Sequence, residues 1–220
     1  MKFDISYTID ALPRLLEGAL VTLQISLLGF VLSLALATSL TLMRETTDWR
    51  WAHRVLAVYI SFIRGTPLLV QIFLIFYVSP VIGLDIGPFL AGILAITLNS
   101  AAFVVEILRG GLASVPSGQF EAARALGLKG RALWGKVILP QTVIASVPAV
   151  VNEFPQVLKA TALLSTITIV ELMRVSQQIY TRNYHPVEIL TGTFIMYFLM
   201  CFAVSRGAAH LESRMKRRQA

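Results

Sequence analysis

The sequence is poor in charge and in cysteine. Only 14% of its 220 residues are Asp, Glu, Lys or Arg, whereas 56% are hydrophobic, and the mean hydropathy is +0.72. This composition excludes an ordinary soluble domain, in which about a quarter of the residues are charged. The single cysteine, Cys201, excludes an intrachain disulfide and a site built from several thiolates.

Motifs for chemistry are missing as well. The sequence has no Gly-x-Ser-x-Gly elbow and no phosphate-binding glycine-rich loop that ends in Lys-Ser or Lys-Thr. Its three histidines (His53, His185 and His210) stand far apart, so we expect no metal site. We therefore expect a protein that is not an enzyme and holds no cofactor of its own. A chain of this kind that moves a solute uphill must take its energy from a partner or from an ion gradient.

Long uncharged runs dominate what is present. Residues 19–43, 65–84 and 86–105 form runs of 25, 20 and 20 residues, and residues 137–152 and 189–205 form runs of 16 and 17. A helix needs about 20 residues to cross the hydrocarbon core of a bilayer. The sequence therefore predicts an all-α membrane protein with five transmembrane helices, in a single domain spanning residues 1–220. We interpret the shorter run 160–170 as the end of the fourth span or as a re-entrant piece.

The positive charges indicate how these spans are oriented. Fourteen of the 19 Lys and Arg residues fall inside the cell if the N-terminus lies outside and the C-terminus inside. They lie in the loop after the first span, at the inner start of the second span, in the loop after the third span and in the C-terminal tail. These residues are Arg44, Arg50, Arg54, Arg64, Arg109, Arg124, Lys129, Arg131, Lys136, Arg206, Arg214, Lys216, Arg217 and Arg218. Because topology accounts for the net charge of +7, we expect no binding to nucleic acid.

The two ends of the chain differ from the spans. Residues 1–18 contain acidic residues and Pro13, so we expect no cleavable signal peptide there, and their spaced apolar residues predict an amphipathic lead-in at the membrane surface. The basic tail, residues 207–220, carries Lys216, Arg217 and Arg218, which we interpret as an anchor to anionic membrane lipid.

A short polar helix interrupts the membrane pattern. Ser117 is expected to cap its start and Gly127 to end it, which leaves about two and a half turns, too few to be stable alone in water. The small side chains of Ala122 and Ala123 allow close approach, so the loop 118–135 predicts a docking element for a cytoplasmic partner. Glu121 has three interpretations: a contact to the partner, a stabiliser of its own helix N-terminus, or a pair with Arg124.

A second group of polar residues lies within the spans, where such groups are costly and mark functional sites. Asn99 and Glu106 share a face of the third span, and Glu106 lies three residues before Arg109. We interpret Glu106 and Arg109 as a structural or gating ion pair. Asn99 is either a substrate contact or an interhelical hydrogen bond.

The fourth span carries the remaining polar candidates. Asn152, Gln156 and Lys159 share one face, Glu153 stands about 100° away on an ideal helix, and Pro155 is expected to bend or break the helix. Glu153 and Lys159 suit the ammonium and carboxylate of an amino acid. The alternative is that Glu153 and Lys159 pair with each other.

The polar interruption resembles the signature of the membrane subunits of bacterial ABC importers. Glu121-Ala122-Ala123 is followed after three residues by Gly127, and nine residues later by Val137-Ile138-Leu139-Pro140, with Val137 in the place of an isoleucine. The polar amino acid branch of that family is similar in four further segments: Arg64-Gly65-Thr66-Pro67 with Gln71, residues 106–119, Asn152-Glu153 with residues 158–161, and residues 12–23.

The resemblance implies a mechanism and a set of partners. A type I importer permease of this family forms a pore with a second permease subunit, identical or paralogous. Two cytoplasmic ATPase subunits bind ATP and Mg²⁺, and each receives one coupling helix, here Glu121, Ala122, Ala123 and Gly127 with Pro140. A periplasmic or surface-tethered binding protein delivers the amino acid to the bacterial cytoplasmic (inner) membrane.

Within that resemblance the substrate contacts are expected at Asn99, Asn152, Glu153, Gln156 and Lys159. Arg64 and Pro67 are expected to shape a kink at the start of the second span. Two alternatives stay open: an ABC permease for another small solute, and a secondary transporter driven by an ion gradient. The second predicts inverted repeats, which we do not find in five spans.

Overall fold

The computed structural model describes residues 3–47 and 49–219, with side chains up to His210. Within this part the chain is helical throughout its regular elements. The α-helices are α1 (Ser6–Thr46), α2 (Arg50–Gly65), α3 (Leu68–Val78), α4 (Pro88–Ala113), α5 (Ser117–Ala125), α6 (Gly130–Leu133), α7 (Leu139–Ala160), α8 (Leu172–Asn183) and α9 (Pro186–Gln219). Short 3₁₀ segments follow α3 and α7, at Pro80–Ile82 and Thr161–Ile167, and a π-helical turn, Trp134–Ile138, joins α6 to α7.

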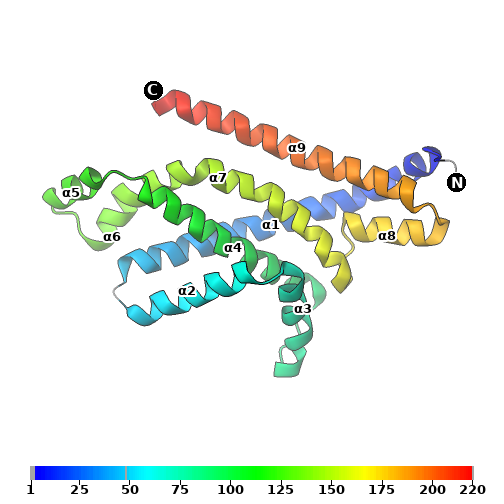
Figure 1. The fold of residues 1–220 in the computed structure, drawn as a ribbon, viewed down its shortest axis with the longest axis horizontal. Helices are drawn as coiled ribbons and strands as arrows, with labels where there is room; N and C mark the ends of the chain where they lie inside the picture. Colours follow the sequence, from blue (N-terminus) through cyan, green and yellow to red (C-terminus); the bar gives the residue numbers. More distant parts are fainter. Residues whose placement is uncertain (1–2, 48, 220) are drawn as a thin grey trace.

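The long helices lie along one another and separate the connections into two groups (Figure 1). The start of α1, helix α8 and the α8–α9 connection lie at one end of the bundle. The α1–α2 connection, α5, α6 and the end of α9 lie at the other. Helix α3 leaves the bundle sideways.

Helix α1 packs along α4, and its small side chains make this close packing possible. Its buried residues are mostly Ala, Gly, Ser and Thr, whereas its large apolar residues, such as Leu20 and Leu27, are exposed. At Gly18 an added Cβ would lie 2.8 Å from the Cα of Leu172 at the start of α8. Small residues inside and large ones outside are typical of helices that pack within a membrane.

The second apolar run begins with the kink that the sequence predicted. We predicted a span over residues 65–84 with a kink at its start, and α2 and the segment Leu68–Ile82 meet there at 112°. Thr66 between them is extended (φ −126°, ψ 148°). The reason is local: Pro67 lacks an N–H group and its ring disfavours the helical conformation at the preceding residue.

The fourth span is not broken at Pro155. The sequence predicted a bend or a break there, and α7 continues as a helix through Pro148 and Pro155 and ends only at Ala160, which contradicts the break. The lost backbone hydrogen bond at Pro155 is tolerated because neighbouring elements hold the helix: Val157 and Leu158 are buried, and Phe154 packs on Phe30 of α1 with ring centroids 5.1 Å apart.

Four helical stretches of the described residues are long and apolar enough to cross a membrane, or five if the bent pair counts as one. They are Ser6–Thr46, Pro88–Ala113, Gly130–Ile167 and Pro186–His210, and the pair is Arg50–Gly65 with Leu68–Ile82. The run that we interpreted as the end of the fourth span is the 3₁₀ segment that closes Gly130–Ile167. Residues 6–18 of the expected lead-in are the first turns of α1 itself. The side chains of Lys216, Arg217 and Arg218 lie outside the described residues.

Candidate functional site

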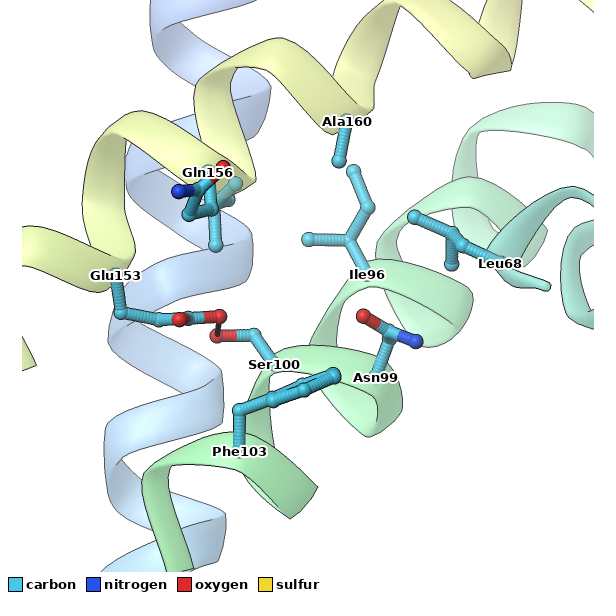
Figure 2. Close-up of a pocket in the computed structure, with 9 residues that line it drawn as sticks. Leu68, Ile96, Asn99, Ser100, Phe103, Glu153, Gln156 and Ala160 are labelled. Atoms are coloured by element: carbon cyan, nitrogen blue, oxygen red, sulfur yellow. Dashed lines mark hydrogen bonds between the residues drawn. The ribbon is translucent and has the colours of Figure 1, made fainter. Parts of the chain in front are cut away.

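A cavity of about 450 Å³ opens between α3, α4 and α7. Polar side chains from two helices face it across an otherwise apolar wall: Asn99 and Ser100 from α4, Glu153 and Gln156 from α7 (Figure 2). Leu68, Ile96, Phe103, Val157 and Ala160 complete the lining. A mostly apolar cavity with a few convergent polar groups is the usual form of a small-molecule site.

Glu153 is the charged residue of this cavity. Its side chain is partly buried, and its Oε1 accepts a hydrogen bond of 3.4 Å from the hydroxyl of Ser100. The Ser33 hydroxyl of α1 lies 3.2 Å from that of Ser100, and its single proton has a second acceptor in the Phe30 carbonyl at 2.7 Å. A carboxylate has about four acceptor positions, so Glu153 retains capacity for a ligand that donates.

Asn99 is hydrogen-bonded to Gln71, a residue that the sequence analysis named only as part of the resemblance to the family. Its Nδ2 donates to Oε1 of Gln71 at 2.9 Å. Gln71 is 3% exposed, and its own Nε2 lies 2.9 Å from the carbonyl oxygen of Ile63 and 3.1 Å from that of Thr66. Asn99 therefore lines the cavity and also links α4 to the α2–α3 bend.

The structure brings three of the five expected substrate residues together. Asn99, Glu153 and Gln156 line the cavity, whereas Asn152 and Lys159 lie on an exposed side of α7 and do not. Among the described residues no ion pair joins Glu153 to Lys159, so their direct pairing is not present in this structure.

An ion-pair cluster lies next to the cavity. Oε2 of Glu106 is 2.8 Å from Nη2 of Arg109 and 3.2 Å from Nη1 of Arg64 at the end of α2. The Arg64 guanidinium also lies over the ring of Phe103, 5.7 Å from its centroid, and Phe103 lines the cavity. Glu106 thus has one partner on its own helix and one on the helix that ends at the bend.

The polar interruption forms a separate surface. Helix α5 begins at Ser117, one residue after its N-cap Pro116, and makes no side-chain cap bond. Its end is a Schellman motif: Leu128 N–H donates to the Ala123 carbonyl at 3.0 Å, Gly127 N–H donates to that of Arg124 at 2.9 Å, and Gly127 has φ +76°. Glycine is required there because a Cβ is strained at this φ.

The two adjacent alanines of the motif, Ala122 and Ala123, lie in different surroundings. Ala123 is buried against Leu133 and Ile138, while Ala122 and Glu121 are exposed. No ion pair joins Glu121 to Arg124 within the described part of the chain. Pro140 lies in the first turn of α7, directly after the π-helical turn. The helix is therefore packed on one side and open on the other.

Sequence reasoning missed two residues that stand out in the structure. Leu126, next to Gly127 in the polar loop, is an apolar side chain that is 81% exposed. Glu171 is fully buried and caps α8, accepting from the backbone N–H groups of Met173 and Arg174. The only sequence signal for Glu171 was an acidic residue directly before a helix, and its burial depends on contacts with distant helices.

Comparisons with known proteins agree with this architecture. Residues 29–217 match the family model described as binding-protein-dependent transport system inner membrane component. The chain is 38% identical to the L-cystine transport system permease protein TcyB of Bacillus subtilis, covering 93% of this chain and 88% of TcyB. It is 36% identical to the glutamine transport system permease protein GlnP of Escherichia coli, covering 98% and 99%.

Solved structures show the same fold. A chain of the crystal structure of an amino acid ABC transporter with histidines superposes with a TM-score of 0.89 at 33% identity, covering 97% of this chain and all of the other. An inward-facing structure of the MetNI methionine ABC transporter gives a TM-score of 0.71 at 19% identity, a likeness of fold alone. The chain belongs to the family of inner membrane components of binding-protein-dependent transport systems, the permease subunits of ABC importers.

Proposed function

We propose that this chain is the transmembrane subunit of an ATP-driven importer that carries a polar or charged amino acid into a bacterial cell. The observation that carries the proposal is α5: a short helix with an exposed face, ended by a Schellman motif at Gly127. A helix of nine residues is too short to be stable in water without packing, and an open face on such a helix suits a partner. The named relatives with amino-acid substrates support the choice of solute.

The partners are proposed from the family, and the sequence itself carries no nucleotide-binding motif. In this proposal two cytoplasmic ATPase subunits bind ATP and Mg²⁺, and each receives one α5 with Glu121, Ala122 and the exposed Leu126 at the contact. A second permease subunit completes the pore. A binding protein, periplasmic or tethered to the surface, delivers the amino acid from outside.

The proposed topology has five spans in the inner membrane, with the start of α1 outside and the end of α9 inside. It counts α2 with α3 as one broken span. Two observations support it: the start of α1 and the end of α9 lie at opposite ends of the bundle (Figure 1), and the end of α1 with Arg44 and the start of α2 with Arg50 lie at the same end as α5. Positive charge is concentrated on the cytoplasmic side of membrane proteins.

The cavity between α3, α4 and α7 is the proposed substrate site. Glu153 would receive the ammonium group of the amino acid, with Asn99 and Gln156 as further polar contacts. Asn152 and Lys159 lie outside this cavity, so we assign them to the wall of the pore. Arg64, Pro67, Glu106 and Arg109 form the adjoining element that we propose to open and close with the transport cycle.

The test is transport by Glu153→Gln in proteoliposomes that contain permease, ATPase and binding protein. Loss of a charge-assisted hydrogen bond should lower kcat/KM about 10- to 100-fold, because such bonds contribute roughly 1.5–3 kcal/mol. The matched control is Asp85→Asn, an exposed carboxylate in the α3–α4 connection, which should transport normally. Unchanged transport of glutamine, cystine, histidine and arginine by Glu153→Gln would contradict the assignment of the cavity.

A further inference from the structure

The orientation of one buried amide is determined by the backbone around it. Nε2 of Gln71 lies 2.9 Å from the Ile63 carbonyl oxygen, 3.1 Å from the Thr66 carbonyl oxygen and 3.0 Å from the Thr66 hydroxyl. Both carbonyls belong to the end of α2, where helical carbonyls lack partners within the helix. Backbone carbonyls only accept, so the NH₂ group of Gln71, and not its oxygen, must face them.

The orientation of the Gln71 amide determines that of the Asn99 amide. With its nitrogen turned to the end of α2, Gln71 presents its oxygen to Asn99, 2.9 Å away. An oxygen facing a second oxygen would leave two buried acceptors without a donor, so Asn99 must offer its NH₂ group. The remaining end of the Asn99 amide is its oxygen, and Figure 2 shows that oxygen on the cavity side and the nitrogen turned away.

The cavity therefore presents acceptors at two places. Asn99 Oδ1 faces it from α4 and the Glu153 carboxylate faces it from α7, while the Ser100 hydroxyl donates to Glu153 at 3.4 Å and the Gln156 amide supplies an N–H donor from α7. An ammonium group has three donors and no acceptor, which matches this pair. A ligand carboxylate placed between Asn99 Oδ1 and the Glu153 carboxylate would face two acceptors and no donor from either residue.

We infer that Gln71 is a positioning residue: it holds the Asn99 amide with its oxygen towards the cavity, so that the cavity selects the protonated amine of its ligand. This inference rests on the proposed function of the cavity. It adds that the α2–α3 bend contributes to ligand selection. The backbone carbonyls at the bend orient Gln71, and Gln71 orients the Asn99 amide that the ligand contacts. Without Gln71 the Asn99 amide can turn and present a donor.

The experiment measures binding to the purified full-length permease by saturation-transfer NMR titration. The probes are L-glutamine and L-arginine, each compared with its desamino counterpart, in which hydrogen replaces the α-ammonium. The quantity is the dissociation constant of the desamino compound divided by that of the amino acid, which measures the preference for the ammonium group. In Gln71→Leu this ratio should fall about tenfold, the effect of roughly one hydrogen bond to a charged group. Gln71→Met serves as a second variant if the leucine variant does not fold.

A rescue separates positioning from packing. Adding Asn99→Asp to Gln71→Leu should restore the preference for the ammonium, because a carboxylate presents an acceptor whichever way it turns. Thr66→Val is the matched control: it removes one acceptor of Gln71 but leaves both backbone carbonyls, so the ratio should equal that of the wild type. A wild-type ratio in both Gln71 variants, or no rescue by Asn99→Asp, would overturn the inference.

Failure of the proposed function gives a different result. In that case no probe binds the wild-type permease, or Glu153→Gln leaves every affinity unchanged, and the inference falls with it. If Glu153→Gln weakens binding of both amino acids while Gln71→Leu keeps the full preference for the ammonium, the cavity is the substrate site and only the role of Gln71 is wrong.

Discussion

The hydroxyl of Tyr197 in α9 donates a hydrogen bond of 2.9 Å to Oε2 of Glu171, the residue that caps α8. The same carboxylate accepts from the backbone N–H groups of Met173 at 2.9 Å and Arg174 at 2.8 Å, and from the Thr22 hydroxyl of α1 at 3.5 Å. One fully buried carboxylate thus joins three helices. A buried charge is tolerated only with such a set of donors.

This network predicts a graded loss of stability. Tyr197→Phe removes one donor and should lower the free energy of unfolding by about 1–2 kcal/mol. Glu171→Ala should lower it further, because the N–H groups of Met173 and Arg174 and the Tyr197 hydroxyl lose their acceptor. Denaturation in mixed micelles measures both effects, with Tyr184→Phe, at a residue 76% exposed, as the neutral control. Equal stability of Tyr197→Phe and Tyr184→Phe would show that the bond contributes nothing.

Much of this architecture was predictable because its signals are local. Uncharged runs of sufficient length predict helices that can cross a membrane, and a glycine such as Gly127 marks a helix end whatever surrounds it. Pro67 likewise predicted the kink before α3. These residues act through their own backbone or through neighbours along the chain, so their effect can be derived without the fold.

Other features could not be derived because they depend on tertiary contacts. Pro67 accounts locally for the break between α2 and α3, but a proline alone does not determine its angle of 112°. Pro155 was expected to bend or break α7, and buried neighbours keep that helix unbroken. The pairing of Gln71 with Asn99 joins residues 28 positions apart, and that of Glu171 with Thr22 joins residues 149 apart. Neither pairing has a signature in a single sequence.

The contact between α4 and α7 predicts a sharp difference between two adjacent glycines. A Cβ on Gly111 would lie 2.9 Å from the Thr142 carbonyl oxygen and would clash with the Ser146 hydroxyl, whereas a Cβ on Gly110 would meet nothing within 4 Å. Gly111→Ala should therefore destabilise the protein by about 1–3 kcal/mol through overpacking. Gly110→Ala, in the same helix, should be neutral or slightly stabilising. Thermal unfolding distinguishes the two, and equal melting temperatures would contradict the close packing.

The end of α5 predicts a selective loss of partner binding. Gly127→Val should leave membrane insertion intact but abolish co-purification of the ATPase, because a β-branched residue is strained at φ +76° and the Schellman turn cannot form. Gly83→Val is the matched control. Gly83 has φ +80° with open space around it and follows the 3₁₀ segment after α3, away from α5. If the ATPase still co-purifies with Gly127→Val, or is lost equally with Gly83→Val, the turn is not what positions the docking surface.

The two arginine partners of Glu106 predict different effects on coupling. Arg64 belongs to α2, directly before the bend, whereas Arg109 belongs to α4 with Glu106 itself. Movement of the bend relative to α4 would break the bond to Arg64 and leave the bond to Arg109 intact. Arg64→Gln should therefore release the bend and raise ATP hydrolysis in the absence of substrate.

The expected change is modest, because partly exposed ion pairs contribute about 0.5–1 kcal/mol, which corresponds to roughly a two- to fivefold change in a conformational equilibrium. Arg109→Gln is the matched control and should leave substrate-free hydrolysis close to that of the wild type. Both rates are measured on the reconstituted complex with its ATPase, at low and at high salt. High salt should reduce the difference between wild type and Arg64→Gln, since it screens exposed charges. Equal rates for the two arginine variants would mean that the bend does not move relative to α4 during the cycle.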